Sequence, residues 1–256
     1  MDQTLIDRPV RTVRRDAGYF GRFECLRLSR TWDGVLVARL GGAGGALAFA
    51  PRAYDELLDA FRRIRRDPRN RAVVLTGVGG DFIAGFAAGR RGARWRRSGG
   101  IRPVLSALAA LDVPLIAAVE GRAHAHPEIA LLADLVVAGD QAVFQRPRSG
   151  DPAEIDAVRD LWRHRVGRLR ADAFLVHPLP LSASRAAAWG LVDELTANGG
   201  ALARAIELAR LYLAAPDHVR RGLRADSASS LRGALSLTEH EPFGSRARQS
   251  DVRLVA

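Results

Sequence analysis

Lysine is absent from this 256-residue sequence, so all 39 of its basic side chains are arginines. Alanine is abundant, and this combination is the skew that a GC-rich genome produces. The formal net charge of +11 is therefore weak evidence for a surface selected to hold a polyanion, and we expect no nucleic-acid partner. The densest basic segment, residues 90–100, joins five arginines to Trp95 and keeps nucleic-acid binding open as an alternative. We interpret it as a solvated loop over the mouth of a binding site, with contact to an anionic substrate as a further alternative.

Cysteine is nearly absent too, since Cys25 is the only one. A single thiol excludes an internal disulfide framework and any zinc site built from cysteines, and it fits a reducing compartment. No apolar run approaches the roughly 18 residues of a membrane span. The first 20 residues also lack the apolar stretch of a secretion signal. We therefore expect a soluble, cytoplasmic protein without a membrane partner.

What the chain does contain is enough apolar material for a large core, with 48% hydrophobic residues. Residues 1–20 are polar, basic and without periodicity, and we expect a mobile arm there. Two short strands, 23–30 and 34–40, flank a three-residue spacer and predict a hairpin. Pro51 opens an amphipathic helix over residues 51–67, and a β-branched run that stops in glycines follows at 71–82.

The same order of elements then recurs. A helix, a buried strand, a second helix and a third strand are predicted at 101–112, 113–121, 128–134 and 135–139, with 142–146 open as a further strand. Alternating buried strands and helices predict a mostly parallel sheet with helices outside, an α/β fold. The last third is predicted to be helical throughout, in segments 182–195, 201–215 and 216–241.

Chemistry-bearing side chains gather in one turn. The stretch "EGRAHAHPEIALLAD" (Glu120–Asp134) places two histidines between a buried strand and a helix. His124 and His126 would share one face if the segment were extended, but no spacing supplies the further ligands of a metal site, so we expect no metal. The sequence contains no G-x-S-x-G elbow, phosphate-binding loop, H-E-x-x-H motif or dinucleotide fingerprint, which disfavours a serine hydrolase or nucleotide enzyme.

Three segments together resemble the crotonase superfamily of enoyl-CoA hydratases and isomerases. They are "RAVVLTGVGGDFIAGFAAG" (71–89), "LDVPLIAAVEG" (111–121) and "EIALLADLVVAGDQAVFQ" (128–145), and the resemblance extends from about Phe23 to Glu241. It implies a crotonase-like spiral of ββα units over residues 21–195. It also implies a C-terminal helical oligomerisation region over 196–256, and hence a homotrimer or a dimer of trimers.

The resemblance implies an oxyanion hole for an enolate. Two backbone N–H groups would hold the developing negative oxygen, and one such preorganised donor is commonly worth about 3 kcal/mol. By motif position the first donor is the N–H of Phe86, and the second lies at Ala125 in the histidine turn. Glu128 stands where hydratases keep a catalytic glutamate, although an acid in the first turn also favours the helix dipole.

The histidine turn departs from ordinary hydratases, which carry three glycines there. "HAHPE" is shorter and bulkier, and it disfavours the usual pose of a coenzyme A thioester. The turn instead resembles the 6-oxocamphor hydrolase branch, whose members cleave a carbon–carbon bond of a β-diketone without coenzyme A. "DPRNRAVVLTG" (67–77) and "PEIALLADLVVA" (127–138) are similar to that branch as well.

Site residues carry over from that branch by position. The turn histidine corresponds to His126, the aspartate that holds a base histidine to Asp151, and a pocket glutamate to Glu241, with Glu239 as a rival. The base histidine itself is missing, and Arg148 stands in that segment. Two further pocket positions correspond to Phe49 and Tyr54, and His124 is a third pocket candidate.

Each candidate also has a plain structural explanation. His126 could cap a helix, Asp151 could begin the helix after it, and the C-terminal glutamate could be solvated. The preferred hypothesis is a cofactor-independent enzyme that cleaves or rearranges a cyclic or polyketide-like 1,3-dicarbonyl through an enolate, with retro-Claisen hydrolysis foremost. A hydratase, isomerase or thioesterase for an acyl-CoA or carrier-bound acyl chain is the alternative. A degenerate member that only binds a ligand or partner is the third.

Overall fold

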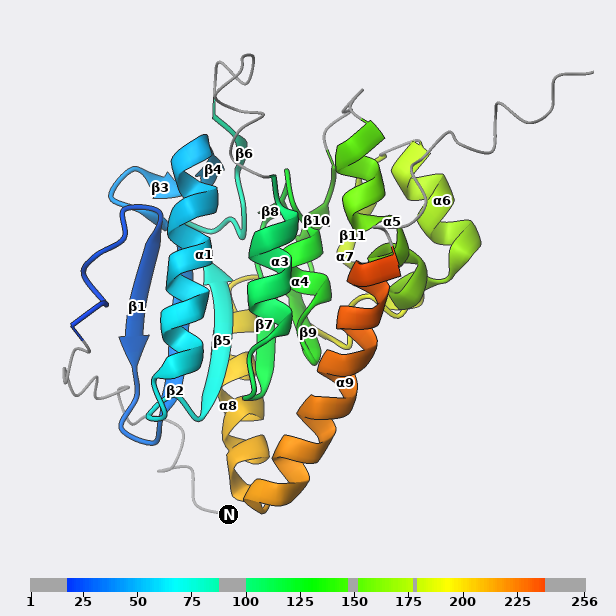
Figure 1. Cartoon of the computed structure of the whole chain (residues 1–256). Coiled ribbons are helices and arrows are strands. Elements are labelled where there is room, and N and C mark those ends of the chain that lie inside the picture. The colour runs from blue at the N-terminus through cyan, green and yellow to red at the C-terminus, as the bar shows by residue number, and fades with distance from the viewer. Residues whose placement is uncertain (1–17, 88–99, 147–151, 177–178, 238–256) are drawn as a thin grey trace, which may run out of the picture.

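A seven-stranded sheet forms the centre of the computed structural model, which describes residues 18–87, 100–146, 152–176 and 179–237 (Figure 1). Its spatial order is β1-β2-β5-β7-β9-β12, with β3 paired to β2. These strands are β1 (Leu26–Arg30), β2 (Val35–Gly42), β3 (Gly45–Ala46), β5 (Ala72–Gly77), β7 (Leu115–Val119), β9 (Leu135–Gly139) and β12 (Glu194–Thr196). From β2 to β12 the neighbours along this order are parallel, so the predicted α/β fold is confirmed.

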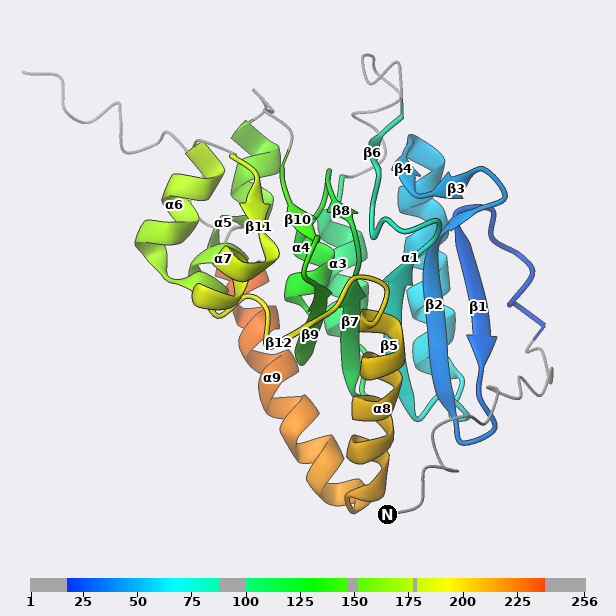
Figure 2. The same ribbon diagram turned by 180° about the vertical axis from the view of Figure 1, so that it is seen from behind.

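The predicted hairpin is the antiparallel pair of β1 and β2, in which Arg30 lies opposite Leu36. Side chains of β2 alternate between two cores: Val35 and Val37 face α8 (Ala201–Ala214), while Leu36 and Ala38 face the opposite side. Both faces of the sheet are covered, with α1 (Pro51–Arg66) and α3 (Arg102–Ala109) on one and α8 on the other (Figures 1 and 2). This explains why the strands appear in the sequence as continuous apolar runs.

Helix α1 confirms the prediction from its periodicity. It begins at Pro51, whose missing N–H costs nothing in a first turn, and arginines occupy its last turn, where they favour the negative end of the helix dipole. Its buried stripe includes Leu57, Phe61 and Ile64. Tyr54, in the first turn, belongs to the same stripe and is 3% exposed.

Two small sheets lie beyond the carboxyl ends of these strands. One joins β4 (Ala48–Phe49) to β6 (Gly85–Phe86), and the other has the order β11-β10-β8. The second is built from β8 (Arg122–Ala123), β10 (Val143–Phe144) and β11 (Leu181–Ser182). A parallel bridge between Ile83 and Ala123 links the two. The strand left open at 142–146 is present as β10, and the bridge between Ile83 and Ala123 brings the segment after β5 beside the segment after β7.

The prediction of a helical last third is wrong in one segment. Residues 182–195 form only the short helix α7 (Ala183–Ala188) before the chain turns at Gly190, which has a positive φ of 76°. The segment then ends in β12, which adds to the sheet beside β9. Backbone pairing at the free edge of the sheet thus overrides the helical spacing of the alanines. The other two predicted helices are α8 and α9 (Asp217–Leu237), and residues 238–241 lie outside the described part.

Helices α4 (Glu128–Leu131), α5 (Pro152–Val166) and α6 (Arg168–Val176) complete the described elements. Helix α4 is a single turn, shorter than the predicted 128–134. Helix α9 runs diagonally from the end of α8 to α5 (Figure 1), and Arg102 of α3 donates a hydrogen bond to the Leu235 carbonyl of α9. None of the helices within the described ranges is long and apolar enough to cross a membrane.

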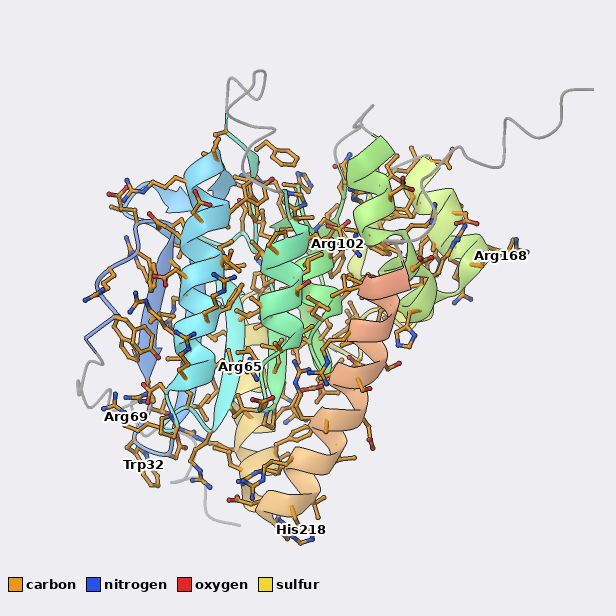
Figure 3. All side chains as sticks on the ribbon, viewed as in Figure 1. Trp32, Arg65, Arg69, Arg102, Arg168 and His218 are labelled. Carbon is orange, nitrogen blue, oxygen red and sulfur yellow. The ribbon has the colours of Figure 1, made fainter. Side chains whose placement is uncertain are left out.

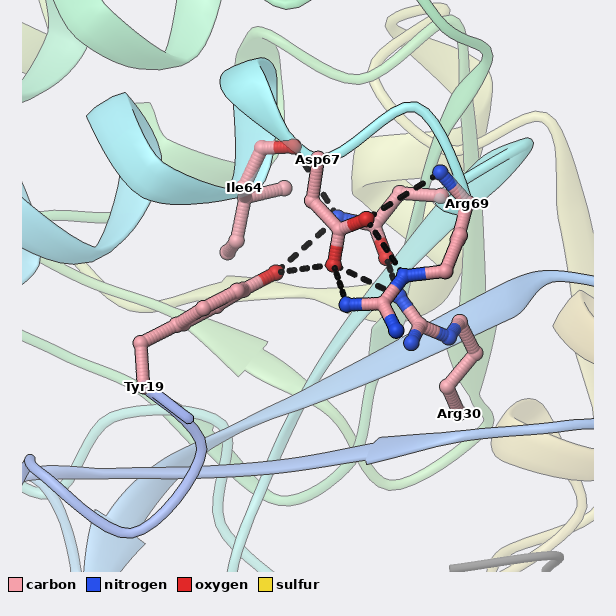
Figure 4. A network of polar contacts seen from close by, with 6 residues as sticks. Tyr19, Arg30, Ile64, Asp67 and Arg69 are labelled. Carbon is pink, nitrogen blue, oxygen red and sulfur yellow. Dashed lines mark hydrogen bonds and ion pairs between the residues drawn. The ribbon is translucent and has the colours of Figure 1, made fainter. Parts of the chain in front are cut away.

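The arm predicted over residues 1–20 ends earlier than expected. Phe20 is buried in the main core, and the Tyr19 hydroxyl contacts Asp67 at 3.3 Å and accepts from the Asn70 amide at 3.1 Å (Figure 4). An aromatic pair with a buried polar partner has both apolar area and hydrogen bonds to hold it to the body. Residues 1–17 lie outside the described part, so the rest of that prediction is untested. The exposed side chains of the described part include Arg65, Arg69, Arg168 and Trp32 (Figure 3).

Candidate active site

The residues after β5 run beside the residues after β7. Phe82 N–H donates to the Glu120 carbonyl at 2.9 Å, and Ile83 N–H donates to the Arg122 carbonyl at 2.8 Å. His124 N–H in turn donates to the Ile83 carbonyl at 2.9 Å. This parallel pairing carries the two segments forward together, so that the motif containing Phe86 and the turn containing His126 come together.

Ala125 is the only residue other than glycine with a positive φ in the described part of the chain, at 70°. His126 N–H donates back to the His124 carbonyl at 3.0 Å, which closes a three-residue γ-turn around Ala125. The Ala125 N–H itself donates no hydrogen bond to any described residue. It is therefore available to an acceptor that the described residues do not provide, in line with the predicted donor role, which stays a prediction.

The two histidines do not share a face, because the segment between them is turned rather than extended. His124 is half-buried, and burial together with the nearby Arg122 charge lowers its pKa, against an opposing influence of Asp81. Asp81 and Arg122 form an ion pair at 2.7 Å beside it. A joint metal site for the two imidazoles is not supported by this geometry, and no group of three or more potential metal ligands occurs among the described residues.

His126 lies in an aromatic enclosure and is 1% exposed. The rings of Phe49 and Phe86 stand edge-on to its imidazole, with centroids 4.7 and 5.2 Å away. On its Nε2 side the Tyr54 hydroxyl lies 2.7 Å away, a buried hydrogen bond between residues 72 apart in the chain. Three candidates from separate segments, Phe49, Tyr54 and Phe86, are thus assembled around a fourth.

Glu128, at the first position of α4, is fully buried. Its Oε1 lies 2.7 Å from the Arg146 Nε and accepts the Trp162 indole N–H at 2.9 Å, while Oε2 lies 3.7 Å from the His126 Nδ1. Burial alone would raise the pKa of Glu128. The Arg146 charge, the contact with His126 and the indole N–H outweigh burial and hold that pKa below its ordinary value. The carboxyl group is accordingly an ionised, charge-compensated group inside the protein.

Arg146 and Trp162 were not among the candidates from the sequence. Arg146 lies two residues after the end of β10, and Trp162 lies on α5, so neither is near Glu128 in the chain. A general rule could have indicated that the Glu128 carboxylate has a partner. A carboxylate that is buried in the protein needs a cation or a hydrogen-bond donor beside it. That rule does not say which of 39 arginines supplies the charge.

Several candidates lie outside the described residues: Arg148, Asp151, Glu239, Glu241 and the arginine cluster from 90 to 99. The helix expected after Asp151 is present as α5, which begins at Pro152. The described part therefore brings together Phe49, Tyr54, Phe86, Ala125, His126 and Glu128. It places His124 next to them on the other side of the turn.

Comparison with known proteins gives a consistent family. The model of the enoyl-CoA hydratase/isomerase family matches residues 33–239. 4-Chlorobenzoyl coenzyme A dehalogenase-2 of Arthrobacter sp. is 30% identical over 224 residues, which cover 82% of this chain and 80% of that protein. A probable enoyl-CoA hydratase of Mycobacterium tuberculosis is 32% identical over 202 residues, covering 77% of this chain and 81% of its own.

Among solved structures, a β-diketone hydrolase from the cyanobacterium Anabaena sp. PCC 7120, bound to (S)-3-oxocyclohexyl acetic acid, superimposes with a TM-score of 0.81. It is 29% identical, and the match covers 87% of this chain and 92% of that one. An enoyl-CoA hydratase/isomerase from Mycobacterium paratuberculosis has a TM-score of 0.73 at 22% identity, over 84% of this chain and 89% of its own. At this identity, the similarity to the Mycobacterium paratuberculosis protein shows a shared fold and nothing about activity.

Proposed function

Because this chain belongs to the enoyl-CoA hydratase/isomerase family, a crotonase-fold family of enzymes, we propose that it hydrolyses a carbon–carbon bond of a small 1,3-dicarbonyl by a retro-Claisen reaction, without a cofactor. The observation that supports this most directly is the His126 imidazole, enclosed by Phe49, Tyr54 and Phe86 beside the expected oxyanion donors. Aromatic rings around a single polar group are the kind of lining that sites for compact apolar molecules have, and a cyclic or polyketide-like diketone is such a molecule. The similar β-diketone hydrolase from Anabaena supports the same reaction class.

The proposed reaction consumes water. A water oxygen adds to one carbonyl carbon, and the Phe86 and Ala125 N–H groups hold the resulting oxyanion. When the carbonyl re-forms, the bond to the central carbon breaks and its electron pair becomes the enolate of the second carbonyl. Protonation of that carbon completes the reaction, so a diketone and one water give a ketone and a carboxylic acid.

The remaining candidates have roles around this path. His126, or Asp151 directly, would take the proton from water, since an imidazole exchanges protons usefully near neutral pH. Glu241, or Glu239, and Arg148 would line the pocket together with Phe49, Tyr54 and His124. Asp151, Arg148 and both glutamates lie outside the described residues, so their roles rest on position in the sequence.

A second candidate function is an acyl-CoA hydratase, isomerase or thioesterase, or an enzyme for a carrier-bound acyl chain. Its support is the names of the relatives at 30–32% identity, a coenzyme A dehalogenase and an enoyl-CoA hydratase. The turn at Ala125 and His126 weighs against it, because side chains occupy the place where glycines would let the backbone approach a thioester. Coenzyme A chemistry is therefore the second choice and not the first.

The deciding experiment offers both substrate types in water enriched in oxygen-18. The protein is incubated with a panel of cyclic β-diketones and with crotonyl-CoA, and products are analysed by mass spectrometry. Retro-Claisen hydrolysis puts one heavy oxygen into the new carboxyl group of a keto acid and leaves crotonyl-CoA unchanged. Hydration of crotonyl-CoA without diketone cleavage would favour the second candidate instead. Tight diketone binding with no turnover of any compound would favour a non-catalytic member.

A matched pair of variants tests the site. His126→Ala is expected to lower diketone turnover by about 10²-fold or more, as the loss of a positioned acid–base group does. His218→Ala removes a histidine that is exposed at the start of α9 (Figure 3) and should leave turnover unchanged. Full activity of the first variant would exclude the proposed site.

Assembly and location belong to the proposal as well. Members of this family are typically oligomeric enzymes for small molecules, and we infer a homotrimer or dimer of trimers through the C-terminal helical region. Light scattering during size-exclusion chromatography measures the mass directly. A value near the 27.7 kDa of one chain would contradict the trimer. A cytoplasmic location stays a prediction from the sequence.

A further inference from the structure

Five side chains from five segments form one continuous buried set of polar contacts. Tyr54 comes from α1, His126 from the turn after β8, Glu128 from α4, Arg146 from the segment after β10 and Trp162 from α5. The contacts run from the Tyr54 hydroxyl to the His126 Nε2 at 2.7 Å, from the His126 Nδ1 to the Glu128 Oε2 at 3.7 Å, and from the Glu128 Oε1 to Arg146 and Trp162. The order is phenol, imidazole, carboxylate and cation.

The two oxygens of Glu128 have different surroundings. Oε1 lies 2.7 Å from the Arg146 Nε and takes the Trp162 indole N–H at 2.9 Å. Oε2 has no hydrogen-bond partner within the described residues and faces the His126 Nδ1 at 3.7 Å, inside ion-pair range but longer than a hydrogen bond. A buried carboxylate oxygen needs a donor, and the nearby Nδ1 is a group that can carry one.

This arrangement decides where the imidazole proton lies. A negative oxygen beside Nδ1 favours the neutral tautomer with hydrogen on Nδ1, so Nε2 carries a lone pair. The Tyr54 hydroxyl, 2.7 Å away, then donates its hydrogen to Nε2. Had the hydrogen been on Nε2, a lone pair on Nδ1 would face the carboxylate, which is electrostatically unfavourable.

We propose that Tyr54, His126 and Glu128 form a proton relay in which the Tyr54 phenol is the catalytic group that exchanges a proton with water and with the enolate. Arg146 and Trp162 are positioning residues: they hold Glu128 ionised and oriented so that His126 keeps its tautomer. In the relay the water proton reaches His126 through Tyr54, in place of direct transfer to the imidazole. The relay supplies the base function of the histidine that residues 146–151 lack. The chemical step of the relay rests on the proposed retro-Claisen function, whereas the tautomer of the His126 imidazole does not.

The relay balances over one turnover. As a water oxygen bonds to the carbonyl carbon, one water proton moves to the Tyr54 oxygen and the phenolic proton moves to the His126 Nε2. The imidazolium that forms faces the Glu128 carboxylate, which stabilises it. When the carbon–carbon bond breaks and its electron pair becomes the enolate, Nε2 returns the proton to Tyr54, and the phenol protonates the enolate carbon. No oxidant, reductant or further reactant is needed.

The first test needs no substrate. Histidine is labelled with nitrogen-15, and the His126 signals are assigned by comparison with His126→Gln. The relay predicts hydrogen on Nδ1 and a hydrogen-bonded acceptor at Nε2 in the wild type. Glu128→Gln removes the carboxylate and should abolish this tautomer preference. Hydrogen on Nε2 in the wild type, or an unchanged tautomer in the variant, would overturn the relay.

A second variant covers the case in which Glu128→Gln does not fold. The double variant Glu128→Gln with Arg146→Met removes the carboxylate and its cation together, and so leaves no uncompensated buried charge. Trp162→Phe is milder, because it removes only the indole donor. The double variant should lose the Nδ1 tautomer and Trp162→Phe should weaken it. A tautomer that persists in the folded double variant would overturn the relay.

The second test measures proton transfer. Tyr54→Phe is expected to lower kcat for diketone cleavage by about 10²–10⁴-fold with little change in KM, since only the acid–base group is lost. Tyr212→Phe, a half-buried tyrosine on α8, is the matched control and should keep full activity. In deuterium oxide, the wild type should also exchange the hydrogens next to the ketone of 3-oxocyclohexyl acetic acid, and Tyr54→Phe should not.

These readouts separate failure of the relay from failure of the proposed function. If no diketone is cleaved but the tautomer and the Tyr54-dependent deuterium exchange are found, the relay stands and retro-Claisen hydrolysis is wrong. If diketones are cleaved and Tyr54→Phe retains wild-type kcat, hydrolysis stands and the relay is wrong. If neither cleavage nor exchange occurs, the catalytic role of Tyr54 is overturned with the function.

Discussion

Glu128 and Arg146 form an ion pair inside the protein, with 2.7 Å between Oε1 and Nε and side chains that are 0% and 5% exposed. Removing one partner of such a pair leaves a charge in a medium that solvates it poorly, and the usual cost is about 3–5 kcal/mol. We therefore expect Arg146→Met to lower the free energy of unfolding by an amount in that range, measured by urea denaturation. Arg204→Met is the control, because its pair with Glu194 is 37% exposed and should contribute less than about 1 kcal/mol. Equal losses in the two variants would contradict this account.

Asp67 makes stability depend on pH. Its carboxylate receives hydrogen bonds from Arg30 at 2.8 Å and from the Arg69 side chain and backbone (Figure 4). Burial would raise the pKa of Asp67, but these bonds, and the charge of Arg30, hold it well below its usual range. Since the folded pKa lies below the unfolded value of about 3.9, the stabilisation is complete above that value and is lost as pH falls toward the folded pKa.

Asp67→Asn tests this sign directly. At pH 7 the free energy of unfolding of the variant should be about 2–4 kcal/mol lower than that of the wild type. This difference should shrink as pH is lowered below about 4. Urea denaturation at several pH values gives the curve. Asp59→Asn changes a carboxylate that is 49% exposed and should shift stability by no more than about 0.5 kcal/mol at any pH. A difference that grows at low pH would reverse the argument.

Much of the fold was predictable because its signals are local. The apolar stripe of α1, the β-branched run of β5 and the glycines after it each dictate one element. Gly190 shows the limit: the spacing of the alanines around it favours a helix, and only pairing with β9 explains why the chain turns there and forms β12. Pairing with a strand more than 50 residues away leaves no trace in the local pattern.

The candidate site also contains residues that the sequence could indicate and a contact that it could not. His126 could be identified because histidine after a buried strand is unusual, and Phe49 and Tyr54 by position in a family pattern. The carboxylate–arginine contact could not, because Glu128 and Arg146 meet through the pairing of β8 with β10. Which arginine compensates a buried acid is a property of packing and not of spacing.

The γ-turn at Ala125 predicts an unusual response to substitution. A φ of 70° in this turn is strained for a residue with a β-carbon. Ala125→Gly relieves that strain while making the unfolded chain more flexible, so thermal unfolding should show a change within about 1 kcal/mol. Ala125→Val adds β-branching at the same φ and should cost more than about 1–2 kcal/mol. If valine were tolerated as well as glycine, the turn would not have the geometry described. Because glycine keeps the N–H, Ala125→Gly should also retain diketone turnover.

Arg224 predicts how helix α9 is held. Its guanidinium is 2% exposed and pairs with Asp134 at 2.9 Å, while Nε donates to the Leu111 carbonyl at 3.0 Å. These contacts reach the end of α3 and the start of β9, so they tie α9 to the body of the protein. Arg224→Met should therefore destabilise this helix first, since it removes the pair and a carbonyl partner at once.

Hydrogen exchange measured along the chain separates local from global loss. Amides of α9 should exchange at least about tenfold faster in Arg224→Met, while those of β5 and β7 should change less, because the central strands open only with the whole sheet. Arg221→Met, on the exposed side of the same helix, should leave both sets unchanged. Uniform acceleration across α9 and the sheet would mean that Arg224 supports the whole fold and not the docking of one helix. In that case α9 and the sheet would unfold as a single cooperative unit.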